Sequence, residues 1–463
     1  ADTHSVAWSG AAIIAVAPRE TPPPAPSAPL LPPAHKNVLV IVLDALRAHN
    51  VGCYGYGRDT TPTIDAVART GVRFERMYAS APYTTSSTWS LFTSLHPFQH
   101  GGLAGRRRPI PSVPTVQQTL GEQGFVTGAV SGNPFIASSS ATGLARDFHE
   151  VIETFDDVGD MLRLEPRNIT ETTDEAIGFL QRHRDERFFL YAHYMLPHAP
   201  YYPAAEYIQL FALDPIDSVE PHSAWLEAVN RHLQPLQREQ RAQLETRYDE
   251  SIRYVDAELK RMLDALVQLG IDNDTLVVIT ADHGDSFWEH GVLSHGRVIY
   301  DDIMNVPLVL RGNGISDALR PHLAKPVSTV DLFPTLCDAL GIEAPPGLVG
   351  RSLFRRAPES DPEVIQAFCQ GDFRLMRAYW WPRFKLIVNY TQPNDELYDI
   401  ERDPGERRDL ADLCPVLTHY YRAQADAWLV HQGQFGAVTV AVDQRPLDEE
   451  QAERLKALGY FDE

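Results

Sequence analysis

Residues that could bind a divalent metal ion follow three apolar runs of this chain. Asp44 comes directly after "NVLVIVL", and Asp282 and His283 come directly after "TLVVITA". His193 and His198 stand within and just beyond a third run, "RFFLYAHYM". Two carboxylates and an imidazole can hold a divalent cation, which would lower the pKa of a nearby hydroxyl and screen the charge of an anionic ester. We therefore expect Asp44, Asp282 and His283 to bind one metal ion.

The hydroxyl that would attack an anionic ester beside this metal could come from residues 81–97, "APYTTSSTWSLFTSLHP", where several Ser and Thr residues precede a Leu-Phe pair. One interpretation is an N-capped buried helix, because Ser and Thr accept hydrogen bonds from the free N–H groups at a helix start. The other is a nucleophilic hydroxyl on the first helical turn, where the amides and the helix dipole favour negative charge. His198 and His295 are then candidates to contact the anion or to protonate the leaving group.

The elements that must position these residues are strands and helices in alternation. Apolar runs cover residues 37–43, 125–131, 187–195 and 275–281, and the clearest helical pattern covers 236–269. Continuous apolar runs are typical of strands buried on both faces, and their alternation with helices predicts a three-layer α/β domain around a mostly parallel sheet. Ligands of such sheets bind beyond the carboxyl ends of the strands, where the polar residues named above would meet.

The chain divides into three parts by its sequence texture. Residues 1–36 form an apolar stub and a proline-rich linker, 37–355 carry the α/β pattern, and 356–463 predict a smaller α+β subdomain with helices near 416–430 and 448–458. The stub is too short to span a bilayer by itself, and a proline-rich stretch is a semi-rigid spacer. We expect an extracytoplasmic protein, periplasmic or secreted, with a membrane tether upstream of the linker as one hypothesis.

The charge balance restricts the partners. With 62 acidic and 41 basic residues, the net charge of −21 disfavours binding to nucleic acid. An anionic substrate is still compatible with this charge, because a metal ion or a histidine cluster can dominate one pocket. We expect a small-molecule, lipid or glycan ester as the substrate. The four cysteines form no CxxC pair, which argues against a zinc-thiolate site.

Several motifs, in order along the chain, resemble the sulfatase branch of the alkaline phosphatase superfamily. They are "VLDALRAHNVGCYGY", "TTPTIDAVARTGVRFERMYASAP", "SLFTSLHPFQHG", "ITADHGDSFWEHGVLSHG" with "VIYDDIMNVPLVL", and "ELYDIERDPGERRDLA". Together they extend from Asn37 to about Leu410, so the resemblance is far more specific than any one short motif. It implies an alkaline-phosphatase-like sandwich fold and a metal-dependent ester hydrolase or transferase.

The resemblance also implies roles for individual residues. By position, the metal ligands fall on Asp44, Asp282, His283 and the nucleophile Thr84, and the substrate contacts fall on Arg47, His198 and His295. We expect the last three side chains to face the metal. Ala45 and Leu196 stand where relatives often carry further acidic residues, so one ion is expected rather than two. The mixed oxygen and imidazole donors favour Mn²⁺ or Zn²⁺, with Ca²⁺ and Mg²⁺ as alternatives.

The nucleophile region departs from the sulfatase pattern. Sulfatases carry a Cys or Ser there, in a Cys/Ser-x-Pro-x-Arg context, and convert it to formylglycine, which threonine cannot form. Thr84 is instead typical of phosphodiesterases and of phosphoryl transferases in the superfamily. We therefore expect a phosphodiester or phosphonate hydrolase or transferase with a covalent Thr84 intermediate, and we expect Thr85, Ser86 and Ser87 to cap the helix. A sulfate-ester hydrolase and an inactive binding or assembly subunit are the alternatives.

Overall fold

The computed structural model describes residues 35–102, 108–109, 114–137, 140, 142–155, 167–211, 229, 236–355, 365–371, 374–392, 394–435 and 442–443. The apolar stub, the linker up to residue 34 and the helix expected near 448–458 lie outside these ranges. None of the helices in the described ranges combines the length and the apolar character that crossing a membrane requires.

A seven-stranded sheet lies at the centre, in the order β2-β12-β8-β1-β7-β5-β6. The four predicted strands are all present as β1 (Asn37–Leu43), β5 (Val126–Ser131), β7 (Phe188–Tyr194) and β8 (Thr275–Thr280). They run parallel, with β1 between β7 and β8. The two edge strands are β6 (Glu150–Glu153) and β2 (Val72–Arg73), and β12 (Leu308–Arg311) lies between β2 and β8, antiparallel to both. Every residue of β1 and β7 is buried, as their continuous apolar runs predict.

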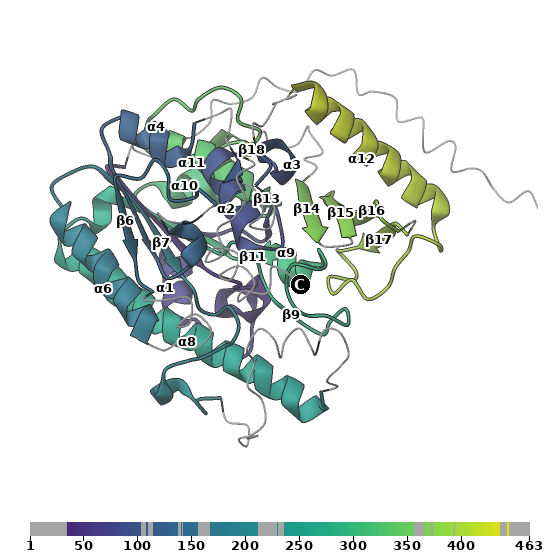
Figure 1. Cartoon of the computed structure of the whole chain (residues 1–463), viewed down its shortest axis with the longest axis horizontal. Coiled ribbons are helices and arrows are strands. Elements are labelled where there is room, and N and C mark those ends of the chain that lie inside the picture. Colours follow the sequence, from purple (N-terminus) through teal and green to yellow (C-terminus); the bar gives the residue numbers. More distant parts are fainter. Residues whose placement is uncertain are drawn as a thin grey trace, which may run out of the picture.

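Helices cover both faces of this sheet (Figure 1). On one face lie α1 (Pro62–Thr70), α6 (Arg167–Arg182) and α8 (Arg238–Gln268), and α8 contacts both of the others. On the other lie α2 (Thr84–Thr93), α4 (Val116–Glu122), α10 (Ile315–Leu319) and α11 (Leu332–Ala339). The predicted three-layer α/β fold around a mostly parallel sheet is therefore confirmed.

Short elements connect these layers. They are α3 (Pro97–His100), α9 (Asp301–Met304), β3 (Met77–Tyr78), β11 (Asn305–Val306), β13 (Val327–Ser328), the hairpin β9 (Ser286–Phe287) and β10 (Leu293–Ser294), and the pair β4 (Arg108–Pro109) and β18 (Val442–Asp443).

The C-terminal part forms a smaller antiparallel sheet with one long helix. Its strands, β14 (Ile365–Gly371), β15 (Arg374–Trp380), β16 (Phe384–Asn389) and β17 (Glu396–Asp399), pair in sequence order, and α12 (Pro415–Phe435) contacts β16. The buried Lys385 joins this sheet to α9, because its Nζ lies 2.8 Å from Asp301 Oδ1 and 2.5 Å from Glu406 Oε1. The predicted α+β character of this part is confirmed.

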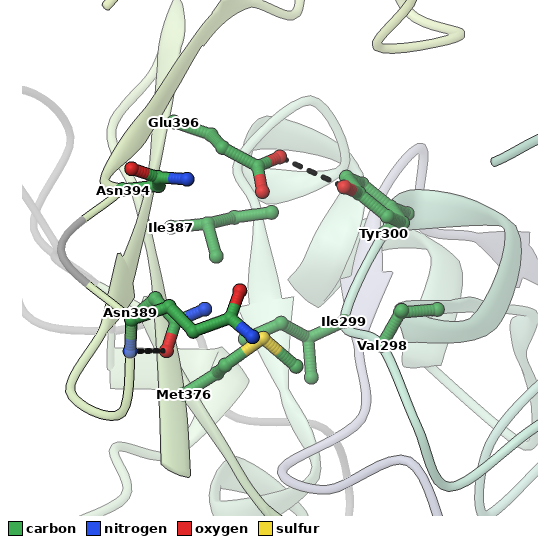
Figure 2. A pocket seen from close by; sticks show the side chains of 9 residues that line it. Val298, Ile299, Tyr300, Met376, Ile387, Asn389, Asn394 and Glu396 are labelled. Carbon is green, nitrogen blue, oxygen red and sulfur yellow. Dashed lines mark hydrogen bonds between the residues drawn. The ribbon is translucent and has the colours of Figure 1, made fainter. Parts of the chain in front are cut away.

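A polar pocket of about 200 Å³ lies where the two parts meet, between residues 298–300 and the C-terminal sheet (Figure 2). Met376 and Ile387 line its apolar side, and the carboxylate of Glu396 accepts a hydrogen bond from the hydroxyl of Tyr300 at 2.8 Å.

Candidate active site

The predicted metal ligands lie at the carboxyl end of the central sheet, just beyond two paired strands. Val42 of β1 pairs with Thr280 of β8, and Asp44 and Asp282 each follow two residues later. Because both aspartates lie two residues beyond a pair of neighbouring strand residues, their carboxylates lie close together. Ligand atoms of Asp44, Asp282 and His283 lie within 4.8 Å of one another, and all three residues are buried. The structure thus brings together the cluster that the sequence predicts.

Each carboxylate of this cluster has one oxygen engaged and one free. Asp282 Oδ1 accepts hydrogen bonds from the backbone N–H groups of Ala45 at 3.2 Å and His283 at 2.9 Å. Asp44 Oδ2 accepts one from Asn133 Nδ2 at 2.6 Å. Asp282 Oδ2 and Asp44 Oδ1 are buried without a hydrogen-bond partner in the described part of the chain. Because burying an unpaired carboxylate oxygen is costly, these two atoms indicate a cation site.

The imidazole of His283 completes the set. Its Nδ1 lies 2.9 Å from the carbonyl oxygen of Gly284, which can only accept, so Nδ1 carries the proton. In the neutral ring Nε2 then presents a lone pair, 3.6 Å from the free oxygens of both Asp44 and Asp282. Two carboxylate oxygens and one imidazole nitrogen therefore converge, and these residues fit a divalent ion.

The charged groups of the cluster and the histidines around it shift the pKa values of His283 and Asp44. Burial alone would lower the pKa of His283, but the charges of Asp282 and Asp44 raise it above its usual value. Burial alone would raise the pKa of Asp44, but His198, His193 and His283 hold it below the usual range. Opposite charges this close favour the ionised carboxylate, which is the form that binds a cation.

Thr84 is the first residue of α2, and its hydroxyl faces the cluster. Its Oγ1 lies 3.4 Å from Asp44 Oδ2 and 3.5 Å from His283 Nε2. The first N–H groups of a helix have no partner inside the helix, and here the earliest helical bond runs from Ser87 N to Tyr83 O. The amide-rich, positive end of the helix dipole therefore lies at the Thr84 oxygen and favours negative charge there.

The expectation that Thr85, Ser86 and Ser87 cap this helix is wrong. The N-cap residue is Tyr83, whose side chain makes no capping hydrogen bond. Ser86 Oγ donates instead to the carbonyl oxygen of Gly102, and the hydroxyls of Thr85 and Ser87 are buried without a partner among the described residues. All ten residues of α2 are buried, and in the described ranges none of these three hydroxyls accepts a hydrogen bond from the free amides of the first turn.

His295 lies against the cluster and is held by Asp285. The ring centroids of His283 and His295 are 4.2 Å apart, and those of His198 and His295 are 4.9 Å apart. His295 Nδ1 lies 2.6 Å from Asp285 Oδ1, and Asp285 Oδ2 accepts a hydrogen bond from the hydroxyl of Tyr201 at 2.8 Å. Asp285 thus fixes the proton on Nδ1 and leaves His295 Nε2 available to a substrate.

His198 has the same tautomer. Its Nδ1 lies 2.6 Å from the carbonyl oxygen of Ala199, so Nδ1 donates, and Nε2 makes no hydrogen bond within the described ranges. The structure therefore places both predicted substrate histidines, His198 and His295, beside the metal cluster. Their contacts with a substrate stay predictions.

Arg47 lies near the site, but its guanidinium is engaged by other residues. Its Nη1 lies 2.5 Å from Glu289 Oε1, its Nε donates to Asn50 Oδ1, and it lies 4.8 Å from the centroid of the Phe287 ring. In the described ranges no hydrogen bond or ion pair joins Arg47 to the three metal-site residues. The sequence predicts that Arg47 faces the metal, whereas in the structure the charge of its guanidinium pairs with Glu289. A contact between Arg47 and the substrate stays a prediction.

Residues beyond those predicted hold the Asp44 carboxylate in place. Asn133, His193 and Tyr191 form a chain: Asn133 donates to Asp44 Oδ2, His193 Nε2 lies 3.1 Å from the same oxygen, and His193 Nδ1 lies 2.8 Å from the Tyr191 hydroxyl. The sequence singles out His193 but assigns it no role. Asn133 stands two residues beyond β5, and this position past the carboxyl end of a buried strand is the signal in the sequence that could identify it.

Comparison with known proteins agrees with this geometry. The family model described as Sulfatase matches residues 36–342. The uncharacterized sulfatase YidJ of Escherichia coli (strain K12) is 26% identical over 428 residues, covering 81% of this chain and 83% of that protein. The Delta 4,5-hexuronate-2-O-sulfatase of Bacteroides thetaiotaomicron is 26% identical over 422 residues, covering 81% and 84%.

A solved structure shares the fold. The phosphonate monoester hydrolase of Agrobacterium radiobacter superposes with a TM-score of 0.68 at 20% identity, covering 86% of this chain and 96% of that one.

Proposed function

Since this chain belongs to the sulfatase family, in the alkaline-phosphatase-like sulfatase branch, we propose that it hydrolyses phosphoryl-type esters with a divalent metal ion and a covalent intermediate on Thr84. Phosphodiesters and phosphonate monoesters are the proposed substrate class. The observation that carries the proposal is the position of Thr84 Oγ1, at a helix N-terminus and 3.4 Å from Asp44 Oδ2. Threonine cannot become formylglycine, so direct attack by its own oxygen is the route open to it.

Asp44, Asp282 and His283 would hold the metal, with the Thr84 oxygen as a further ligand. When bound, a divalent ion supplies positive charge that lowers the pKa of a hydroxyl and offsets the charge of an anionic ester. We propose Mn²⁺ or Zn²⁺, because the donors mix oxygen with imidazole nitrogen, with Ca²⁺ and Mg²⁺ as alternatives.

In the proposed reaction Thr84, having released its hydroxyl proton to solvent, forms a bond from Oγ1 to phosphorus. The bond from phosphorus to the leaving-group oxygen breaks at the same time. The Nε2 of His295 or His198 takes up a proton from solvent and delivers it to that oxygen, which departs as an alcohol. Water then attacks the phosphorus, which frees the product acid and restores the Thr84 hydroxyl. An acceptor alcohol in place of water would make the protein a transferase.

Sulfate-ester hydrolysis is the second candidate. It is favoured by both curated relatives reported above, which are named as sulfatases, and by a cluster that would also fit a sulfate group. The third alternative, an inactive binding subunit, is disfavoured because such a protein would have no need of two buried carboxylate oxygens without partners.

The organic part of the substrate is proposed to be a glycan or a lipid. One relative is named as a sulfatase of an unsaturated hexuronate, and one structural neighbour is a complex with a glucosamine disulfate. The proline-rich linker, residues 18–33, supports an extracytoplasmic location near a membrane as part of the same proposal.

The proposal is tested by the turnover of aryl phosphodiester, phosphonate and sulfate esters with each of Mn²⁺, Zn²⁺, Mg²⁺ and Ca²⁺. The wild type should hydrolyse a phosphoryl ester fastest. Thr84→Ala should reduce kcat by on the order of 10³-fold or more, because it removes the attacking oxygen. Thr85→Ala is the matched control, since it deletes the neighbouring buried hydroxyl and should leave kcat within a few-fold. Equal turnover by wild type and Thr84→Ala would disprove the mechanism, and a preference for sulfate esters would support the second candidate.

A further inference from the structure

Helix α12 carries apolar residues on two separate faces. The inner face packs Leu417, Tyr421, Ala425 and Trp428 with the C-terminal sheet. The outer face forms what we call the outer stripe: Leu413, in the turn that leads into the helix, followed by Val416, Tyr420, Ala423, Ala427 and Val430. The fractional exposures of Leu413, Val416, Tyr420 and Val430 are 60%, 71%, 54% and 60%. An ordinary surface helix has one apolar stripe, so the second one needs a reason.

The spacing of the outer stripe is the heptad spacing of a helix–helix contact. Its members are separated by three, four, three, four and three residues. That alternation keeps side chains on one line along a helix that packs against another helix. The helix has 21 residues, so it is roughly 31 Å long, enough for several layers of contact.

None of the six residues of the outer stripe is charged. Arg422 and Asp426 pair with each other at 3.2 Å, and Arg422 also pairs with Asp395 at 2.7 Å on the side away from the stripe. A chain with a net charge of −21 thus presents a long uncharged surface on a helix that lies at the edge of the molecule, beyond the C-terminal sheet (Figure 1). Such a patch is typical of a protein interface.

We propose that the outer stripe binds the outer stripe of a second copy of this chain, as an antiparallel helix pair about a two-fold axis. In that register Tyr420 faces Ala423 of the partner subunit, Val416 faces Ala427 of the partner subunit, and Leu413 faces Val430 of the partner subunit. Large side chains therefore meet alanines in two of the three layers, which is how closely packed helices interdigitate. The sequence of α12 is in this sense complementary to itself, as a two-fold interface requires.

Hydrogen bonding across the pair supports the same occupant. The antiparallel register brings the imidazole of the exposed His419, which can donate, beside the carboxylate of Asp426 of the partner subunit, and the two-fold axis repeats the contact. An anionic membrane surface is a poorer occupant, because the protein is strongly acidic. The proposal is independent of the reaction at Thr84.

Sedimentation velocity on the full chain tests the proposal. The wild type should sediment as a dimer at micromolar concentration, and Tyr420→Glu and Val430→Glu should each sediment as monomers. Val267→Glu is the matched control, because Val267 is also 60% exposed but lies on α8, and this variant should stay dimeric. Circular dichroism should show that all three variants are folded. A monomeric wild type, or stripe variants that stay dimeric, would overturn the proposal.

Cysteine cross-linking tests the register. In a background with Cys53 and Cys414 replaced by serine, Val416→Cys/Ala427→Cys should form an intersubunit disulfide on mild oxidation, and neither single variant should. Residues 416 and 427 of one helix are roughly 16 Å apart, too far for an internal disulfide. Cross-linking of the single Val416→Cys variant would contradict the antiparallel arrangement. If the wild type is monomeric and becomes dimeric on deletion of residues 444–463, the stripe is covered by the chain's own tail and the proposal fails.

Discussion

Replacing Asp282 by asparagine should remove metal binding while leaving the local hydrogen bonds intact. The amide oxygen of Asn can take the place of Oδ1, which accepts from the backbone N–H groups of Ala45 and His283 at 3.2 and 2.9 Å. The amide nitrogen then takes the place of Oδ2, the oxygen that is buried without a partner in the described structure. It can donate toward His283 Nε2 but cannot bind a cation. Asp282→Asn should therefore fold like the wild type and lose only the response to metal.

The size of the metal-induced shift in melting temperature follows from the preferential binding of the metal to the folded state. A metal present at about 100 times its Kd stabilises the folded state by about 2.7 kcal/mol. Each kcal/mol shifts the melting temperature by roughly 2–4 °C in domains of 150–250 residues, and by less in a larger chain. We expect the melting temperature of the wild type to rise by roughly 5 °C when metal is added to chelator-treated protein, and that of Asp282→Asn to rise by at most about 1 °C.

Differential scanning calorimetry on chelator-treated protein, with Mn²⁺ and Zn²⁺ added in turn, measures both shifts. Asp256→Asn is the matched control, because Asp256 is also a buried carboxylate that accepts from two backbone N–H groups, those of Thr63 and Ile64. It should melt lower than the wild type but show the full metal shift. The reasoning is refuted if Asp282→Asn responds to metal as strongly as the wild type, or if no divalent ion shifts the wild type.

Three further predictions concern other residues. Asp285→Asn should lower kcat by roughly 10–100-fold on esters with poor leaving groups and much less on activated aryl esters, because it loosens His295 as a proton donor; an equal loss on both would contradict this. Lys385→Met should cost about 3–5 kcal/mol in urea unfolding, because it removes the cation beside the buried carboxylate of Glu406 and the half-buried one of Asp301, and an unchanged unfolding free energy would contradict it. Burial raises the pKa of Asp256 from its usual 3.8 to about 6, so the folded protein holds this proton more tightly than the unfolded chain. The stabilising contribution of Asp256 is therefore full below pH 3.8 and declines as pH rises to 6, and the melting difference between wild type and Asp256→Asn should show that trend; a difference that grows with pH would contradict it.

The strands and the metal cluster could be predicted because both depend on local pattern. A strand buried on both faces must be continuously apolar, and the first polar residue beyond it lies at the carboxyl edge of the sheet. Asp44 and Asp282 satisfy this rule on adjacent strands, so their proximity followed without a structure. Asn133 follows the same rule on β5, but an uncharged amide does not by itself indicate a metal site.

The other differences depend on long-range contacts. Arg47 pairs with Glu289, which is distant in sequence, and no local pattern indicates that pairing. Hydroxyl residues at a helix start suit capping, but in this wholly buried helix the hydroxyls of Thr85 and Ser87 have no partner among the described residues. Asp285 lies within a recognisable motif, but only the fold shows that it meets His295.

The most direct test of the central claim is to trap the covalent intermediate. The protein is incubated with its metal and a slow phosphodiester bearing radioactive phosphorus, quenched in acid, digested and sequenced by mass spectrometry. The account predicts a phosphoryl group on Thr84, and on the serine of Thr84→Ser, with none on Thr85 or Ser87. Label on another residue, or turnover of the ester by Thr84→Ala at the wild-type rate, would contradict the account.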